Sequence, residues 1–380
     1  MHIKSKLPHT ETSIFTVMTA LAKQENAINL AQGFPDFKSS PELIERVHQY
    51  MLKGFNQYAP MAGVPALRER IAEKIAITHN AKVDMDREIT LTAGATQAIF
   101  TIIAAFVHPG DEVILLEPAY DSYQPSIEIN GGIPIPYPMQ SPDYQIDWLA
   151  FGNLITPRTR MIFINSPHNP TGLTLKAEDY AQLEALVKNT NIIVLSDEVY
   201  EHLVYDEKKP LSVLQYPGLR ERSFAVFSFG KTFHNTGWKL GYAVAPEPLM
   251  EEFRKVHQFN VFSVNTPIQY ALAYYMADPQ TYLGLGNFFQ EKRDYFLELM
   301  TGSRFKPLKC EGTYFHLYDF SAISDEQDTD FATRITKEHG VATIPVSPFY
   351  ARSPRSSVLR FCFAKEKETL ERAAALLVKI

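Results

Sequence analysis

Short apolar runs alternate with helical patterns along the chain from about residue 41. The runs that predict strands are Glu88–Thr92, Glu112–Glu117, Met161–Asn165, Ile192–Ser196, Ser223–Ser228 and Gly241–Val244. Apolar residues recur at helical spacing in Pro41–Lys53, Gly63–Ala76, Ala95–Val107, Ala177–Lys188 and Glu247–Gln258. Buried strands separated by helices indicate an α/β fold, in which helices sandwich a mostly parallel sheet.

The pattern changes near residue 281, and this change predicts a second, smaller domain. A long polar helix is expected over Tyr282–Leu299, followed by strands at Gly312–Tyr318 and Val358–Phe363. We therefore expect a large domain over residues 41–280 and a small α+β domain over 281–380. Residues 1–40 form an arm and an amphipathic helix in this interpretation, and they pack with the small domain or a partner subunit. A chain of 380 residues usually exceeds a single core.

Charge and cysteine content exclude several classes of protein. The formal net charge is −6 with no block of like charges, which argues against a nucleic-acid or anionic-membrane surface. The longest apolar run, Ala98–Val107, is about half of a membrane span. The two cysteines, Cys310 and Cys362, lie far apart without metal-ligand spacing, so we expect buried thiols and no metal site. Without a recognisable signal peptide, the chain is expected to be cytoplasmic.

Reactive and polar residues follow four of the expected strands, where open parallel sheets bind ligands. In chain order they are the Gly94 turn into a helix, Asn169, Asp197 with Tyr200, and Ser228 with Lys231. This set matches the needs of pyridoxal 5'-phosphate (PLP). A lysine bonds covalently to its aldehyde, and an aspartate keeps its pyridine nitrogen protonated. Asparagine and tyrosine can bond the ring oxygen, and a helix N-terminus with a nearby lysine, Lys239, can bind its phosphate.

Each of these features has an ordinary structural explanation when taken alone. Asp197 could cap a helix, Lys231 could be solvated, and the segment HNPTG could be a turn. Gly230-Lys231-Thr232 also resembles the end of a phosphate-binding P-loop, but that motif needs glycine at position 225, which is Ala225. The four features together, each at a strand end, favour the PLP interpretation.

Longer motifs carry a family resemblance over essentially the whole chain. They are NLAQGFPDF (29–37), NQYAPMAG (56–63), NSPHNPTG (165–172), SDEVYEHL (196–203), SFGKTFHNTGWKLGY (228–242) and LRFCFAK (359–365). The chain resembles the fold-type I, class I/II aminotransferases, and within them the branch of methionine aminotransferases and kynurenine/glutamine transaminases.

The resemblance implies a role for each matching residue. Lys231 would carry PLP and move the substrate's α-proton, Asp197 would face the pyridine nitrogen, and Asn169 and Tyr200 would contact the ring oxygen. Ala95, Thr96, Ser228 and Lys239 would bind the phosphate, and Tyr120 would stack on the ring. Tyr58 would reach the phosphate of a neighbouring subunit, which implies a homodimer with shared active sites.

The resemblance also implies how the substrate binds. Arg360 would hold the α-carboxylate in a bidentate pair. Gly33 would lie close to that carboxylate, and Asn169 would touch it. The segment HQFNVFSVNTP (257–267), where dicarboxylate-specific relatives bring an arginine, has none. Phe15, Phe34, Tyr58 and Phe262 would line the side-chain pocket, although each could instead belong to the core.

These features predict ping-pong transamination between an uncharged amino acid and a 2-oxo acid. Methionine and aromatic amino acids are the expected substrates, with histidine, leucine, glutamine and kynurenine as further candidates. Cysteine-S-conjugate β-lyase activity at the same site is the alternative. A regulator with a dead site would predict an attached DNA-binding region or loss of Lys231, and the sequence has neither.

Overall fold

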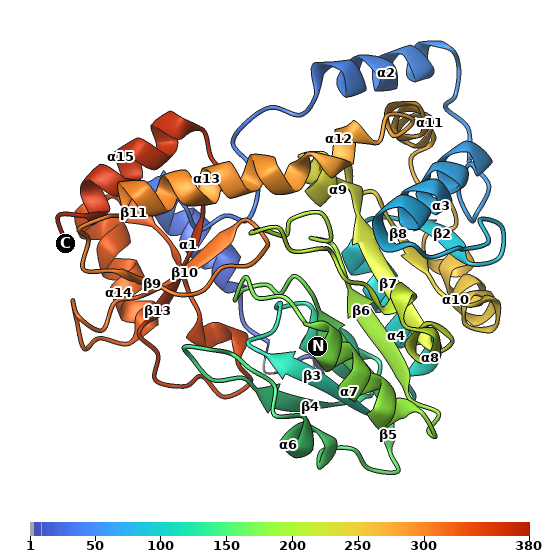
Figure 1. Cartoon of the computed structure of the whole chain (residues 1–380), viewed down its shortest axis with the longest axis horizontal. Helices are drawn as coiled ribbons and strands as arrows, with labels where there is room; N and C mark the ends of the chain where they lie inside the picture. Colours follow the sequence, from blue (N-terminus) through green and yellow to red (C-terminus); the bar gives the residue numbers. More distant parts are fainter. Residues whose placement is uncertain (1–3, 9) are drawn as a thin grey trace.

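A seven-stranded sheet forms the centre of the larger part of the molecule (Figure 1). The computed structural model describes residues 4–8 and 10–380. The strand order is β2-β8-β7-β6-β5-β3-β4, and β8 runs antiparallel to the other six strands of this sheet. The bounds are β2 Ile89–Thr92, β3 Glu112–Glu117, β4 Ile133–Pro138, β5 Thr159–Asn165, β6 Ile193–Asp197, β7 Ser223–Ser228 and β8 Gly241–Val244. The predicted α/β fold with a mostly parallel sheet is confirmed.

Helices cover both faces of this sheet because successive strand side chains point to opposite sides. In β3, Val113 and Leu115 belong to one apolar cluster, and Ile114 and Leu116 belong to the other. The first cluster includes α4 (Ala95–Phe106), α5 (Tyr123–Ile129) and α10 (Glu247–Asn260). The second includes α3 (Pro65–His79), α7 (Ala177–Val187), α8 (Pro217–Arg220) and α11 (Thr266–Tyr275).

The segment of residues 14–29 packs with the C-terminal part of the chain in a smaller region of helices and strands (Figure 1). The parallel strands β1 (Ile28–Asn29) and β11 (Val341–Ala342) join them. A second sheet has the order β12-β13-β10-β9 and is antiparallel at every pairing. Its bounds are β9 Lys306–Pro307, β10 Phe315–Asp319, β12 Ile344–Pro345 and β13 Val358–Cys362. The helices here are α1 (Ile14–Gln24), α13 (Leu285–Leu299), α14 (Asp328–Arg334) and α15 (Lys367–Leu377).

The remaining helices connect these parts. α2 (Pro41–Leu52) lies against α11, and α6 (Trp148–Gly152), α9 (Phe229–Thr232) and α12 (Gln280–Leu283) are short.

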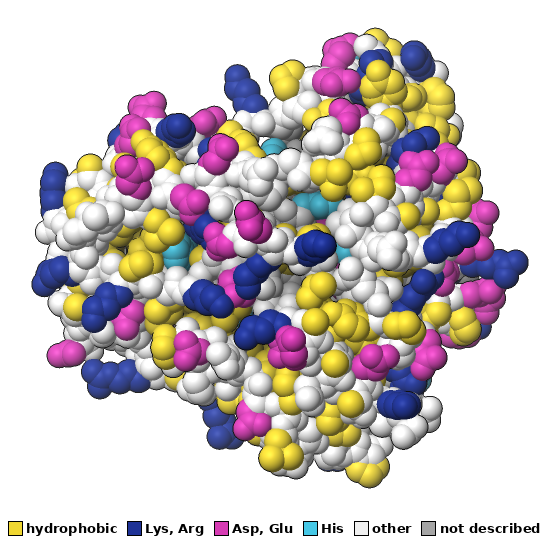
Figure 2. All heavy atoms as spheres, in the orientation of Figure 1, with side chains coloured by type: hydrophobic (Ala, Val, Ile, Leu, Met, Phe, Trp, Pro, Cys, Tyr) yellow, Lys and Arg dark blue, Asp and Glu magenta, His cyan; other side chains and the backbone are white. Residues whose placement is uncertain are grey.

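Figure 2 shows acidic and basic side chains interspersed over one face of the molecule. Within residues 4–8 and 10–380, no helix has both the length and the apolar character that crossing a membrane requires. The same residues hold no group of three acidic, histidine or cysteine side chains placed to bind a metal.

Six predicted strands of the main sheet are present, and their ends agree to within two residues. The sequence did not predict β4, because Pro134, Pro136 and Pro138 interrupt it; an edge strand paired only with β3 tolerates these prolines. The helix expected over Tyr282–Leu299 is instead two helices that meet at Gly284. The strand expected from Gly312 begins at Phe315, because Thr313 has a left-handed φ of 64°.

Candidate active site

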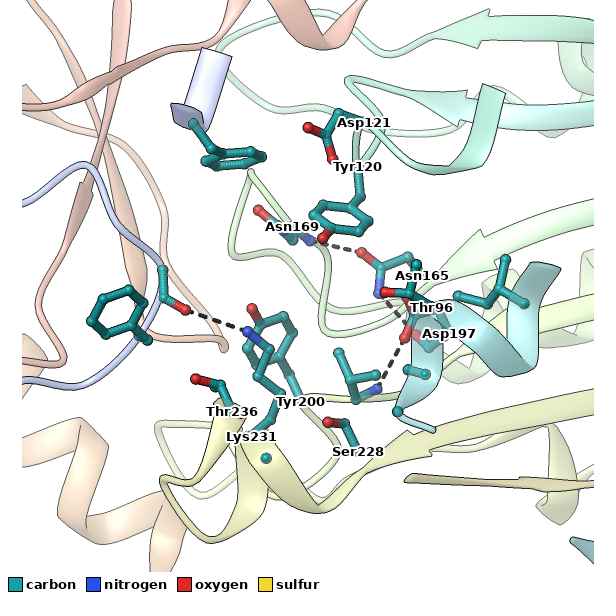
Figure 3. Close-up of a pocket in the computed structure, with 18 of the residues that line it drawn as sticks. Thr96, Tyr120, Asp121, Asn165, Asn169, Asp197, Tyr200, Ser228, Lys231 and Thr236 are labelled. Atoms are coloured by element: carbon teal, nitrogen blue, oxygen red, sulfur yellow. Dashed lines mark hydrogen bonds between the residues drawn. The ribbon is translucent and has the colours of Figure 1, made fainter. Parts of the chain in front are cut away.

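A cavity of about 400 Å³ lies at the carboxyl ends of the parallel strands (Figure 3). Its wall comes from both parts of the molecule, since it includes loops of the main sheet, α1 and β13. The predicted site residues in this wall are Phe15, Gly33, Phe34, Gly94, Ala95, Thr96, Tyr120, Asn169, Asp197, Tyr200, Ser228, Lys231, Lys239 and Arg360. Residues up to 345 positions apart in the sequence therefore meet in one place.

Two predicted site residues, Tyr58 and Phe262, lie outside this cavity. Tyr58 is 83% exposed, and Phe262 is 46% exposed with a left-handed φ of 63°. Their rings pack edge to face with centroids 5.5 Å apart. This aromatic pair is on the surface, so it can contribute to a site only across a subunit interface.

Lys231 points into the cavity from the short helix α9, directly after β7 (Figure 3). Its Nζ donates to the Tyr314 hydroxyl at 2.9 Å and to the Gly33 carbonyl at 3.3 Å. It has no carboxylate partner within ion-pair distance among the described residues. Burial lowers the pKa of Lys231 to about 8. Lys231 is therefore a positioned amine that is partly unprotonated near neutral pH, which a nucleophile and proton carrier requires.

Asp197 is the last residue of β6 and is buried in the opposite wall. The Tyr123 hydroxyl donates to its Oδ2 at 2.6 Å, and the Val199 N–H donates to its Oδ1 at 3.2 Å. The Asn165 amide donates to the Asp197 carbonyl at 2.8 Å, which fixes the strand end. Burial raises the pKa of Asp197 to about 6, so its carboxylate is ionised at pH 7 and above. A cationic ring nitrogen would find a counter-ion here.

The N-terminus of α4 forms an anion cradle. Gly94 caps this 12-residue helix with a φ of 79°, a conformation that favours glycine. Among the described residues, the N–H groups of Ala95 and Thr96 have no hydrogen-bond acceptor. A Cβ on Gly94 would lie 3.5 Å from Lys239 Nζ. Unpaired N–H groups, the helix dipole and an ammonium group thus converge on one spot, as phosphate binding requires.

Arg360 is a fully buried cation in β13. Its Nη1 donates to Asn169 Oδ1 at 2.7 Å and its Nη2 to the Ala31 carbonyl at 3.1 Å, while Nε is buried without a partner. Its guanidinium carbon lies 3.8 Å from the ring centroid of Phe315. Burial lowers its pKa to about 10, which still leaves a cation at neutral pH. A buried cation with no carboxylate partner among the described residues is suited to an anionic ligand.

The sequence pattern of the family described as "Aminotransferase class I and II" matches residues 25–377. The chain belongs to this family of aminotransferases. It is 49% identical to "Methionine aminotransferase" of Escherichia coli K12 over 98% of the chain and 97% of that protein. It is 33% identical to "Kynurenine--oxoglutarate transaminase 1" of mouse over 93% and 92% of the two chains. A solved structure described as an Escherichia coli methionine aminotransferase superposes with a TM-score of 0.98 at 48% identity, covering all of both chains.

Aminotransferases of this family depend on PLP, and the cavity of this aminotransferase fits that cofactor. The anion cradle at α4 suits the phosphate, the Asp197 carboxylate suits a protonated pyridine, and the Lys231 amine suits an aldehyde. The glycine at position 94 matters, because a side chain there would enter the space between α4 and Lys239. When bound, PLP supplies an electron sink for the bond that breaks at the substrate's α-carbon.

The structure adds polar wall and contact residues to which the sequence analysis gave no role, and four of them touch or adjoin a predicted site residue. They are Tyr123 and Asn165 at Asp197, Tyr314 at Lys231, and Asp121 beside Tyr120. The sequence contained one indication that Tyr123 lies near the site, since it stands three residues after Tyr120, at the start of α5. The sequence contained no such indication for Tyr314, because its contact with Lys231 depends on how β10 packs against the main sheet.

The bond between Tyr123 and Asp197 leads to a first prediction. Tyr123→Phe removes the donor to the Asp197 carboxylate and should raise the pKa of that carboxyl, which weakens it as a counter-ion. We expect kcat with methionine to fall by roughly tenfold, the cost of one good hydrogen bond to a charged group. Steady-state kinetics measure this, with Tyr295→Phe as control, because the Tyr295 hydroxyl also bonds to a carboxylate, that of Glu371, but lies outside the cavity wall. An unchanged kcat would contradict the supporting role of Tyr123.

The lowered pKa of Lys231 leads to a second prediction. Only an unprotonated amine attacks an aldehyde, and at pH 7 about a tenth of a group with a pKa of 8 is unprotonated, against roughly one part in 3,000 for an ordinary lysine. In cofactor-free protein, the rate of PLP uptake should rise about tenfold per pH unit below pH 8 and then level off. Absorbance stopped-flow between pH 6 and 10 measures it. A rate that continues to rise through pH 10 would contradict this account.

Proposed function

We propose that this aminotransferase moves the amino group of amino acids with uncharged, mostly apolar side chains to 2-oxo acids, with methionine and aromatic amino acids as preferred donors. The observation that carries the proposal is the buried Arg360, which has no carboxylate partner among the described residues. It offers one site for one carboxylate. Beyond it, Phe15 and Phe34 line the wall, and the other cations there, Lys231 and Lys239, serve the cofactor side. The similarity to a methionine aminotransferase supports the same specificity.

The assignment of roles is part of this proposal. Lys231 would be the covalent anchor and the proton carrier, Asp197 would pair with the pyridine nitrogen, and Tyr200 and Asn169 would contact the ring oxygen. Tyr120 would pack on the ring. Gly33 leaves space beside Arg360, because a Cβ there would lie 2.7 Å from the Phe315 ring. The phosphate contacts are the N–H groups of Ala95 and Thr96 after Gly94, together with Ser228 and Lys239.

The residues of the chain act by holding the substrate and moving one proton. Arg360 and Asn169 fix the α-carboxylate, which sets the direction of the Cα–H bond. Lys231 Nζ takes the α-proton and returns it, and Tyr314 and the Gly33 carbonyl hold Nζ in place between these events. The aromatic wall around Arg360 excludes water, which strengthens the ion pair with the substrate.

A panel of twenty amino acids against several 2-oxo acids tests the proposed specificity. Methionine, phenylalanine and tyrosine should be the fastest donors, and the products should be the matching 2-oxo acids. An apolar pocket changes kcat/KM by only about 10–200-fold between substrates with similar side chains, so the enzyme should accept a broad range of amino acids. Aspartate used as fast as methionine would overturn the proposal. Pyruvate and ammonia release from a cysteine S-conjugate, measured alongside, distinguishes β-elimination from transamination.

We also propose that the enzyme is a homodimer whose subunits share their active sites. Large apolar side chains are exposed on α2, namely Ile44, Met51 and Leu52, and near the end of α10, namely Tyr58, Phe259 and Phe262. A monomer rarely exposes so many large apolar side chains in one region. Burying them against a second copy would bring the Tyr58–Phe262 pair, which lies outside its own subunit's cavity, toward the phosphate end of the partner's site.

Subunit complementation tests this proposal. Lys231→Ala and Tyr58→Ala homodimers should each have reduced activity. After mixing and subunit exchange, a hybrid dimer contains one site with both native residues, so activity should exceed the average of the two parents. No recovery, despite hybrid dimers seen by native mass spectrometry, would overturn shared sites. A monomer in sedimentation equilibrium would overturn the dimer itself.

A cytoplasmic location is the last part of the proposal. Cys310 and Cys362 are both buried and unpaired, as expected of a protein that folds in a reducing compartment.

A further inference from the structure

Asp121 is a charged residue in the cavity wall that has no part in the mechanism described above. It follows Tyr120 in the loop after β3 and is half-buried. Figure 3 shows Asp121 beside Tyr120, across the cavity from Lys231 and Ser228. Its Oδ2 accepts a short hydrogen bond from the hydroxyl of Ser13, which also lines the cavity.

Asp121 contacts a hydroxyl and lies near a helix end, but it has no cationic partner among the described residues. Ser13 is the N-cap of α1, an 11-residue helix, so the carboxylate lies near the positive end of that helix. Among the described residues, no lysine, arginine or histidine forms an ion pair with it. In the described part of the chain, the cavity wall therefore carries a carboxylate side chain that no cationic side chain neutralises.

The segment Ser13–Phe15 connects this charge to the carboxylate anchor. The Phe15 ring centroid lies 5.0 Å from the guanidinium carbon of Arg360 and 6.2 Å from the ring centroid of Tyr120. A substrate whose α-carboxylate is on Arg360 would extend its side chain along this wall, between the aromatic rings and Asp121. A second carboxylate on that side chain would approach a like charge.

We propose that Asp121 is a specificity-determining residue, which rejects amino acids and 2-oxo acids that carry a second carboxylate. The inference rests on the proposed function, because it assumes that Arg360 holds the α-carboxylate. Two carboxylates at about 6–8 Å in a partly buried site weaken binding by roughly tenfold to a hundredfold. A thioether or an aromatic ring has no charge and escapes this penalty. The selectivity for uncharged substrates is thus partly repulsive, in addition to the lack of a second arginine.

The test compares two unreactive acids, 4-(methylthio)butanoate and glutarate, which are methionine and glutamate without the amino group. Their dissociation constants are measured by calorimetry on the PLP-loaded enzyme, and kcat/KM values for methionine and glutamate are measured in parallel. The wild type should bind glutarate at least thirtyfold more weakly. In Asp121→Asn and in Asp121→Ser, the dissociation constant of glutarate divided by that of 4-(methylthio)butanoate should fall by tenfold or more. The kcat/KM for glutamate divided by that for methionine should rise in both variants.

Ser13→Ala is the matched control, because it removes the hydrogen bond and keeps the charge. In Ser13→Ala, the ratio of the two dissociation constants should stay within about twofold of the wild-type ratio. The cofactor absorbance of the Asp121 variants shows whether they are folded. If folded variants leave the ratio of the two dissociation constants unchanged, the inference is overturned. The inference would also be overturned if the Asp121 and Ser13 variants bound both acids equally more weakly than the wild type. Asp121 would then serve only to hold the start of α1 in place through Ser13. A wild type that binds glutarate as tightly as 4-(methylthio)butanoate would overturn the proposed function itself.

Discussion

Lys231→Ala is expected to lower kcat by at least about four orders of magnitude, because it removes both the covalent anchor and the proton carrier. No other lysine can replace it, since Lys239, the other lysine of the cavity wall, lies at the phosphate cradle. The purified variant should also lack the absorbance band near the edge of the visible range that a covalently bound PLP gives.

Turnover of methionine and the absorbance spectrum measure this effect in the same sample. Lys255→Ala is the matched control, since this lysine is exposed on α10 far from the cavity wall. Its kcat and spectrum should equal those of the wild type. A Lys231→Ala variant with more than about one hundredth of the native kcat would contradict the proposed chemistry.

Arg360→Ala should lower kcat/KM for every amino acid donor by about thirtyfold to several thousandfold, mainly through KM. This is the usual cost of removing one partner of a buried charge pair, here the pair formed with the substrate's α-carboxylate. Arg360→Lys should recover little, because a lysine cannot form the bidentate pair or stack on Phe315 as the guanidinium does.

Initial-rate kinetics over a wide range of methionine concentrations separate KM from kcat. Arg355→Ala is the control, because this exposed arginine lies just before β13 and bonds only to a carbonyl. The thermal unfolding temperature of each variant shows whether the loss of a buried side chain also affects folding. A folded Arg360→Ala enzyme whose KM rises less than threefold would show that the α-carboxylate binds elsewhere.

The positions of the proposed cofactor residues were predictable from the sequence because strand ends converge at one edge of a parallel sheet. Asp197 ends β6 and Lys231 follows β7, its neighbour, so reading what followed each apolar run was enough to bring them together. The Gly94 turn was predictable for the same reason, since β2 leads directly into α4. These placements need only local patterns and the general geometry of the sheet.

Contacts between distant segments were not predictable in this way. Tyr314 reaches Lys231, and Ser13 reaches Asp121, only because the smaller region folds against the main sheet. Apolar patterning says nothing about that packing. Arg360 lies between these two cases. The apolar pattern around it predicted only a strand, and the family motif LRFCFAK alone indicated that it contacts the substrate.

A single-turnover experiment tests the central claim most directly. The PLP-loaded enzyme is mixed with methionine, without any 2-oxo acid, and the products are counted per subunit. The account predicts about one equivalent of 4-methylthio-2-oxobutanoate, no free ammonia, and no further product until a 2-oxo acid is added. Aspartate under the same conditions should react far more slowly. Continued release of ammonia without an acceptor, or an equally fast reaction with aspartate, would contradict an aminotransferase for uncharged amino acids.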